Sequence, residues 1–132
     1  MKRNDFRILI AEDEPQVRRL YEKAFKAEGY EVVMAESGCQ LLAELNEGPF
    51  DLLITDMKLM EMSALEALPD VRKRYPKLPI VVVSGYYVNL VEDFKKKGLD
   101  VEMFFNKPLS LSVLMQAVRN ILGIEGVVTS KG

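Results

Sequence analysis

The sequence alternates five times between a short apolar run and a segment with helical spacing, and this alternation limits the fold more than any other feature. Each run is bounded by charged or turn-forming residues, and the runs lie at residues 8–11, 32–35, 52–55, 80–83 and 103–105. They are continuously apolar rather than alternating, which is typical of strands buried on both faces. The pattern therefore predicts a parallel sheet covered by helices on both sides.

The first three predicted helices carry start signals. Pro15 lies near the start of the first helix and Gly29 just past its end, which are the positions that proline and glycine favour in helices. The buried face of this helix is expected to hold Val17, Leu20, Tyr21, Ala24 and Ala27. The second and third helices begin at possible capping boxes, Ser37 with Gln40 and Ser63 with Glu66. Pro69 falls inside the third, so that helix either kinks there or begins at Pro69.

The last two predicted helices end at glycine, a common stop. A helix over residues 88–97 precedes Gly98 and is expected to bury Val91 and Phe94. The final helix ends before Gly123, and its expected buried side chains are Leu111, Leu114, Val118 and Leu122.

Strict alternation of strand and helix implies right-handed crossovers and an open, doubly wound α/β sheet of three layers. A chain of 132 residues hides roughly two thirds of its unfolded surface on folding, enough for one core. We predict one domain over residues 1–123, with 124–132 as a disordered tail or the start of a linker. Ligands of such sheets bind beyond the carboxyl ends of the strands.

Composition excludes several classes of function. The chain has no histidine, which removes histidine-dependent catalysis and imidazole metal ligands. The lone Cys39 suits a reducing compartment, so the cytoplasm is the expected location. The 18 basic and 20 acidic residues give a net charge of −2, which argues against direct binding to nucleic acid or a membrane surface. The apolar stretch at residues 8–11 is too short for a signal peptide or a membrane span.

Polar residues follow four of the five predicted strands. Glu12 and Asp13 come after the first, Asp56 after the third, Ser84 after the fourth and Lys107 shortly after the fifth. Three carboxylates in one crevice repel each other unless a hard cation is bound among them, and Mg²⁺ fits such oxygen ligands best. The lysine, the hydroxyl and a nucleophilic carboxylate then suit a phosphoryl group.

Each of these residues also has a purely structural interpretation. Asp13 could cap the following helix, Asp56 and Ser84 could be turn residues, and Lys107 could be a surface lysine. Their joint placement at successive strand ends favours the functional interpretation.

Over residues 6–122 the chain resembles a response-regulator receiver domain of two-component signalling. The resemblance is carried by four segments, ILIAEDEP, LLITDMKLM, IVVVSG and FFNKP. It implies a flavodoxin-like sheet in the order 2-1-3-4-5 and a signalling domain rather than an enzyme. It also implies that Asp56 receives a phosphoryl group from a phosphohistidine on a sensor histidine kinase or phosphotransfer protein.

The resemblance further assigns a role to each site residue. Asp13 and Asp56 would ligate Mg²⁺ directly, Glu12 through water, and Lys58 through its backbone carbonyl. Lys107 and Ser84 would hold the phosphoryl oxygens.

Four expectations follow for residues around this site. Phe104 matches the switch aromatic whose rotamer follows Ser84, and the fourth helix, fifth strand and fifth helix would form the face that binds a downstream protein. Lys58 and Tyr86 match positions that tune dephosphorylation. The bond between Lys107 and Pro108 is expected to be cis.

Two departures from the family pattern leave local geometry open. Met60 and Ala64 replace the usual proline and glycine after the phosphoacceptor, so the sequence does not determine the path of that loop. The connection from Gly98 to Phe104 is about two residues longer than usual, so the sequence does not determine its path either.

Two other functions share parts of this pattern. A receiver-like module could act as an interaction platform without being phosphorylated. A haloacid-dehalogenase-like phosphatase uses the same chemical groups, but its nucleophile follows the first strand in a DxD pattern, whereas residues 12–14 read Glu-Asp-Glu.

Overall fold

The computed structural model describes residues 5–85 and 90–124. Its elements follow the predicted alternation: β1 (Arg7–Ala11), α1 (Pro15–Ala27), β2 (Glu31–Ala35), α2 (Gly38–Leu45), β3 (Leu52–Asp56), α3 (Ala64–Arg74), β4 (Ile80–Ser84), α4 (Leu90–Lys96), β5 (Met103–Asn106) and α5 (Leu111–Leu122). All paired strands are parallel, and their order is β2-β1-β3-β4-β5. The predicted doubly wound, flavodoxin-like fold is confirmed.

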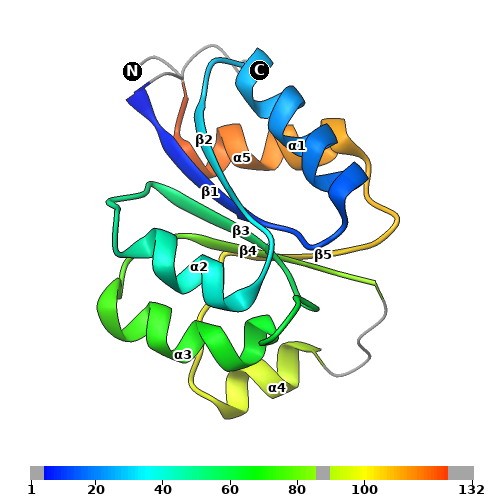
Figure 1. The fold of residues 1–132 in the computed structure, drawn as a ribbon. Coiled ribbons are helices and arrows are strands. Elements are labelled where there is room, and N and C mark those ends of the chain that lie inside the picture. The colour runs from blue at the N-terminus through cyan, green and yellow to red at the C-terminus, as the bar shows by residue number, and fades with distance from the viewer. Residues whose placement is uncertain (1–4, 86–89, 125–132) are drawn as a thin grey trace.

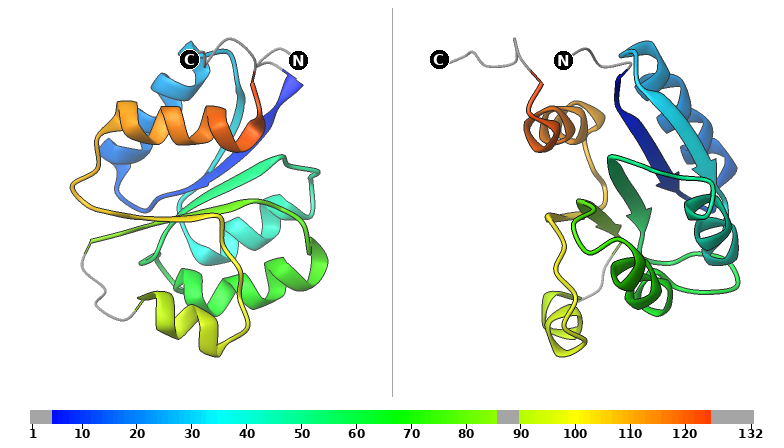
Figure 2. Two further views of the ribbon diagram at one scale, coloured as in Figure 1. Left: turned by 180° about the vertical axis from the view of Figure 1, so that it is seen from behind. Right: turned by 90° about the vertical axis from the view of Figure 1, so that its left-hand side faces the viewer.

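The sheet is the middle layer of three. Figure 1 shows α1 and α5 on one face of the sheet and α2, α3 and α4 on the other, and the views in Figure 2 agree. Each face has its own apolar cluster, since successive strand residues point to opposite sides. Leu9 and Leu53 belong to the cluster under α2, α3 and α4, whereas Ile8 and Ile54 belong to the cluster under α1 and α5.

Each predicted strand is confirmed and extends by one residue. The extensions of β3 and β4 bear on the predicted site, because Asp56 and Ser84 are the last residues of their strands. Burial on both faces holds for β3 and β4 and nearly so for β1. The edge strands β2 and β5 are only partly buried, because each has a neighbouring strand on one side.

The predicted buried faces of two helices need correction. In α1, Tyr21 and Phe25 are buried, whereas Leu20 is exposed and Ala27 is exposed as well. The two aromatic rings, one helical turn apart, bury more apolar surface than the smaller side chains and so set the rotation of the helix. In α4, Phe94 is buried as predicted, but Val91 is 46% exposed.

Capping explains where α2 and α3 begin. The Ser63 hydroxyl accepts from the Glu66 N–H, and the Glu66 carboxylate accepts from the Ser63 N–H, so the predicted capping box is confirmed. The helix α3 therefore begins at Ala64 and contains Pro69, rather than beginning at Pro69. At α2, Ser37 caps the helix, but the Gln40 side chain accepts from the Glu36 N–H instead of completing the box at Ser37.

The two loops whose paths the sequence did not determine are held by hydrogen bonds to their backbone carbonyls. After β3, Met60 pairs with Ser37 in an isolated bridge and accepts a hydrogen bond from the Gly38 N–H. A Cβ on Gly38 would lie 2.5 Å from the Met62 carbonyl oxygen, so this close approach requires glycine. The connection between α4 and β5 is fixed by Arg72, whose guanidinium donates to the Asp100 carbonyl.

The ends of the chain bear on the predicted domain boundary. Ile124, the last described residue, is buried in the cluster under α1 and α5, and the boundary after residue 123 stays a prediction. Among residues 5–85 and 90–124, no helix is long and apolar enough to cross a membrane.

Candidate functional site

The predicted site residues meet at the carboxyl edge of the sheet. Glu12 and Asp13 leave β1, while Asp56 and Ser84 end β3 and β4. Because β1, β3 and β4 are neighbours in one parallel sheet, these strand ends lie side by side. Lys107 follows β5, and its backbone N–H donates to the Ser84 carbonyl at 2.7 Å, which ties the end of β5 to that of β4.

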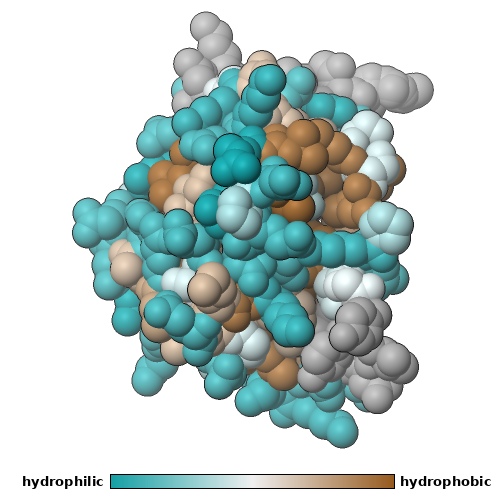
Figure 3. Space-filling view, turned by 45° about the vertical axis from the view of Figure 1, so that its right-hand side comes forward, coloured by the Kyte–Doolittle hydropathy of each residue, from teal (hydrophilic) through white to brown (hydrophobic). Residues whose placement is uncertain are grey.

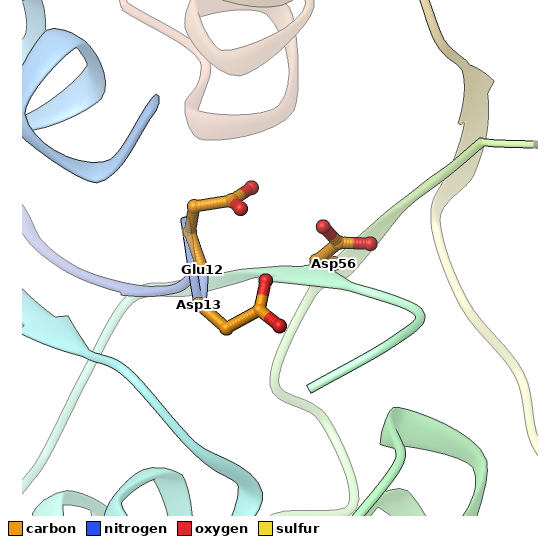
Figure 4. A group of neighbouring side chains, drawn as sticks. All are labelled: Glu12, Asp13 and Asp56. Atoms are coloured by element: carbon orange, nitrogen blue, oxygen red, sulfur yellow. The ribbon is translucent and has the colours of Figure 1, made fainter. Parts of the chain in front are cut away.

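Three carboxylates form a compact cluster. One carboxylate oxygen each from Glu12, Asp13 and Asp56 lies within 4.8 Å of the others, and Figure 4 shows the three side chains gathered between the ends of β1 and β3. Glu12 is only 1% exposed, and Asp56 is also buried. Such closely spaced, poorly hydrated carboxylates are costly to ionise together unless positive charge offsets their repulsion.

Lys107 supplies part of that positive charge. Its Nζ lies 2.7 Å from Oδ2 of Asp56 and 3.7 Å from Oε1 of Glu12. Burial lowers the pKa of Lys107, but the hydrogen bond and charge of Asp56, together with the charge of Glu12, more than offset this, so its pKa is raised. The expected cis bond between Lys107 and Pro108 is confirmed.

The environment of the cluster raises the pKa of Glu12. Burial raises the pKa of its carboxyl to about 7, against a lowering contribution from the Glu14 N–H that it accepts at 3.0 Å. The neighbouring charge of Asp56 raises this pKa further, and Lys107 lowers it. A cation bound here would therefore compete with a proton near neutral pH.

An open cleft of about 670 Å³ lies over the cluster. Its lining includes Asp13, Asp56, Ser84 and Lys107 of the predicted site, and also Lys58. Figure 3 shows the side of the molecule that Figure 1 has on its right, a largely hydrophilic surface broken by an apolar area in its upper part. The cleft is large enough for a cation and a phosphoryl group while remaining open to a partner.

Three further predicted residues have different outcomes. The Lys58 N–H donates to Oδ1 of Asp56 at 3.3 Å, so its backbone lies beside that carboxylate, and its side chain is exposed. Phe104 lies on β5 and packs against the cluster under α4 rather than lining the cleft. Tyr86 lies outside the described residues.

Two contributors to this site were missed by sequence reasoning. Arg18 donates to the carbonyls of Glu12 and Asp13. Tyr21 is buried, and its pKa is raised first by burial and then by the charge of Glu12, so it lies near the acidic cluster. Both stand on α1, where the sequence shows only helical spacing, and nothing in that spacing points to the site.

The donor set fits Mg²⁺. This ion prefers carboxylate and carbonyl oxygens, retains several waters and is commonly bound through one or two carboxylates and a phosphate. The carboxylates of Asp13 and Asp56 in an open cleft satisfy that preference, and buried Glu12 adds negative charge.

Comparison with known proteins agrees with this geometry. The family model of the response regulator receiver domain matches residues 8–119. The response regulator receiver protein CpdR of Brucella abortus is 30% identical over 88% of this chain and 96% of its own. The transcriptional regulatory protein GlrR of Escherichia coli is 29% identical over 87% of this chain, which spans only 26% of that relative.

Solved structures give the same result. A CheY-like response regulator receiver domain protein from Methanospirillum hungatei has a TM-score of 0.82 and 26% identity over 89% of this chain and 94% of that one. The response regulator TrrA from Thermotoga maritima, in complex with Mg²⁺ and BeF, has a TM-score of 0.76 and 27% identity over 92% of this chain and 99% of that one. The chain therefore belongs to the response regulator receiver domains of two-component signal transduction.

Proposed function

We propose that Asp56 is the phosphoacceptor of this receiver domain. A carboxylate oxygen of Asp56 attacks the phosphorus of a phosphohistidine, the P–N bond breaks, and an acyl phosphate forms on the aspartate as the imidazole leaves. The observation that carries the proposal is the ion pair of 2.7 Å between Lys107 and Asp56 inside the carboxylate cluster. A lysine at this distance from Asp56 supports the proposal, because a phosphoryl oxygen on Asp56 would need a positive partner.

Four residues would hold Mg²⁺ in this proposal. Asp13 and Asp56 supply carboxylates, Lys58 its backbone carbonyl, and Glu12 a contact through water. The bound ion would neutralise charge on the transferring phosphoryl group. Lys107 and the Ser84 hydroxyl would bind the phosphoryl oxygens, and both line the cleft beside Asp56.

The phosphoryl donor would be a sensor histidine kinase or a phosphotransfer protein. The 132 residues contain no histidine, so the donor group comes from outside them. The sensor kinase CckA of Brucella abortus is 32% identical over 87% of this chain, which spans 12% of that relative. This similarity supports a partner of the two-component class. A cytoplasmic location, expected from the lone Cys39, and the absence of direct nucleic-acid binding remain predictions.

Intact mass spectrometry tests the phosphoacceptor directly. With Mg²⁺ and acetyl phosphate, the protein should gain one phosphoryl mass, and Asp56→Ala should gain none. Asp100→Ala, which removes an exposed carboxylate elsewhere, should be modified like the parent. Modification that persists in Asp56→Ala, or with Mg²⁺ chelated, would contradict the proposal. A parent that stays unmodified would favour the phosphorylation-independent interaction module.

The output surface is proposed to be the face formed by α4, β5 and α5. Among the side chains that the structure describes, Val91 of α4, Met103 of β5 and Val113 of α5 are large, apolar and exposed. Amide hydrogen exchange with and without beryllium fluoride should therefore show protection changes on these elements. Changes confined to α1 and α2 would contradict this assignment.

The phosphatase alternative has less support. The proposed acceptor, Asp56, ends β3, whereas a haloacid-dehalogenase-like enzyme has its nucleophile after the first strand in a DxD pattern, and residues 12–14 read Glu-Asp-Glu. We therefore propose that this signalling domain turns over no external phosphate ester and only gains and loses its own phosphoryl group. Release of phosphate from a phosphate ester such as p-nitrophenyl phosphate, at a rate abolished by Asp56→Ala, would contradict this.

A further inference from the structure

Arg18 joins the two acidic residues at the end of β1 to the body of α1. Its Nη1 donates to the carbonyl of Glu12 at 3.0 Å and to that of Asp13 at 3.3 Å. Its Nη2 lies 3.9 Å from the Glu36 carboxylate. The side chain is 19% exposed, so most of the guanidinium is packed against the loop that it binds.

Apart from Arg18, the loop between β1 and α1 is restrained by the Glu14 N–H, which donates to the Glu12 carboxylate at 3.0 Å. The Glu12 N–H donates to the Ala35 carbonyl, which extends the pairing of β1 with β2 by one bond. Glu14, at the start of α1, makes no side-chain capping bond. The carbonyls of Glu12 and Asp13 are therefore fixed by Arg18, and each carbonyl belongs to a residue whose side chain enters the acidic cluster.

We infer that Arg18 is a positioning residue for the Mg²⁺ site, setting the backbone from which the Glu12 and Asp13 carboxylates extend. The inference rests on the proposed function and adds a residue that does not itself touch the ion. Groups that orient metal ligands from the outside commonly change metal affinity 10–100-fold when they are removed. Arginine suits this task because one guanidinium nitrogen donates to both carbonyls while the other faces the Glu36 carboxylate.

The direction in which Mg²⁺ affinity changes when Arg18 is replaced distinguishes a positioning role from the electrostatic effect of its charge. Arg18 is a cation next to a site for a cation, so removing its charge would by Coulomb's law strengthen Mg²⁺ binding. Loss of positioning predicts the opposite, a weaker site. Arg19 provides a matched control, because it is the adjacent residue, carries the same charge and is exposed.

Calorimetric titration of Mg²⁺ into the metal-free protein measures this directly. Arg18→Gln should weaken binding roughly tenfold or more, whereas Arg19→Gln should bind as tightly as the parent or slightly more tightly. Arg18→Lys keeps the charge but has one nitrogen to face the two carbonyls and Glu36, and its Mg²⁺ affinity should fall between those of the parent and Arg18→Gln. A merely structural role would lower the thermal midpoint in chelator without changing the Mg²⁺ affinity of the folded protein.

The outcomes separate this inference from the proposed function. If the parent binds Mg²⁺ and is modified at Asp56, but Arg18→Gln and Arg18→Lys bind the ion as tightly as the parent, the positioning role of Arg18 is overturned and the proposed function stands. If the parent itself binds no Mg²⁺, the proposed function fails and the role of Arg18 fails with it. Should Arg18→Gln not fold, Arg18→Lys decides.

Discussion

The ring of Phe104 stands edge-on to the ring of Phe94, with 5.1 Å between the ring centres and 90° between their planes. This contact joins β5 to α4. Phe104 pairs with Val82 in the sheet, and Ser84 pairs with Asn106. Since strand residues two apart share a face, Ser84 and Phe104 lie on the same face as diagonal neighbours. A change at Ser84 can therefore reach α4 through one aromatic contact.

A double-mutant cycle should measure this contact. In the metal-free protein, Phe94→Leu and Phe104→Leu should couple by about 0.5–1.5 kcal/mol in the free energy of urea unfolding, because the edge-to-face pair is lost with either substitution. Phe25→Leu, on the other side of the sheet, should be additive with Phe104→Leu. With Mg²⁺ and beryllium fluoride, the coupling should shrink as the Phe104 ring follows Ser84. An unchanged coupling would contradict the predicted switch.

Removing the positive charge of Lys107 and removing the negative charge of Asp13 should change the stability of the metal-free protein in opposite directions. Without metal, Lys107→Met should lower the free energy of unfolding by about 1–2 kcal/mol, less than the ~3–5 kcal/mol of a fully buried pair, because the Lys107 side chain is 28% exposed. Asp13→Asn should raise it by up to about 1 kcal/mol, because it removes one of three like charges. Added Mg²⁺ should stabilise Lys107→Met strongly and Asp13→Asn weakly.

Denaturation of the parent, Lys107→Met and Asp13→Asn in chelator and in excess Mg²⁺ would measure these changes in the free energy of unfolding. Lys77→Met, which removes an exposed lysine elsewhere, is the matched control and should change stability little. A metal-free Asp13→Asn that is less stable than the parent would show that Asp13 has a structural role, such as capping α1, that outweighs the repulsion.

How well the sequence predicts a residue of the site depends on whether that residue lies at a strand end or on a helix. Asp56 and Ser84 end parallel strands, and the sheet edge brings strand ends together whatever their separation in sequence, so the sequence predicted that these side chains would meet. Arg18 acts through backbone carbonyls, and the sequence does not record which carbonyls a helix residue will reach. The buried face of α1 was mispredicted at Leu20 for a related reason, because the packing of Phe25 against the sheet decides the helix rotation.

The raised pKa of Glu12 predicts an unusual pH dependence. Its folded-state pKa is about 7 and its ordinary value is 4.5, so between these values the folded protein binds more protons than the unfolded chain. The contribution of Glu12 to the free energy of unfolding is therefore greatest below about pH 4.5 and falls as the pH rises to about 7. Relative to Glu12→Gln, the metal-free parent should lose on the order of 2–3 kcal/mol across this window.

Urea midpoints of the parent and Glu12→Gln in chelator, compared from pH 4.5 to 8, would measure that difference. The same titration should govern Mg²⁺ affinity, because the ion competes with the proton on Glu12. The affinity of the parent should rise up to about pH 7 and then level, and this rise should be reduced in Glu12→Gln. Parallel stability curves for the two proteins would show that Glu12 titrates normally.

The lifetime of the acyl phosphate should depend on the side chains that flank the path of attacking water. Lys58 lies at the cleft, and its N–H is bonded to Asp56, while Tyr86 occupies the second tuning position by sequence. Both side chains are bulky and neither supplies a carboxylate or amide to orient water, so we expect a long-lived phosphorylated form.

Replacing Lys58 with Asn and Tyr86 with Ala should therefore shorten that lifetime about tenfold, which corresponds to ~1.4 kcal/mol of barrier. A chase after removal of acetyl phosphate, followed by intact mass, gives the rate. A lysine that pairs with a phosphoryl oxygen stabilises the ground state as much as the transition state and does not hasten hydrolysis, so Lys58→Asn alone should not slow it. If the double variant loses phosphate no faster than the parent, shielding by these two side chains does not set the lifetime.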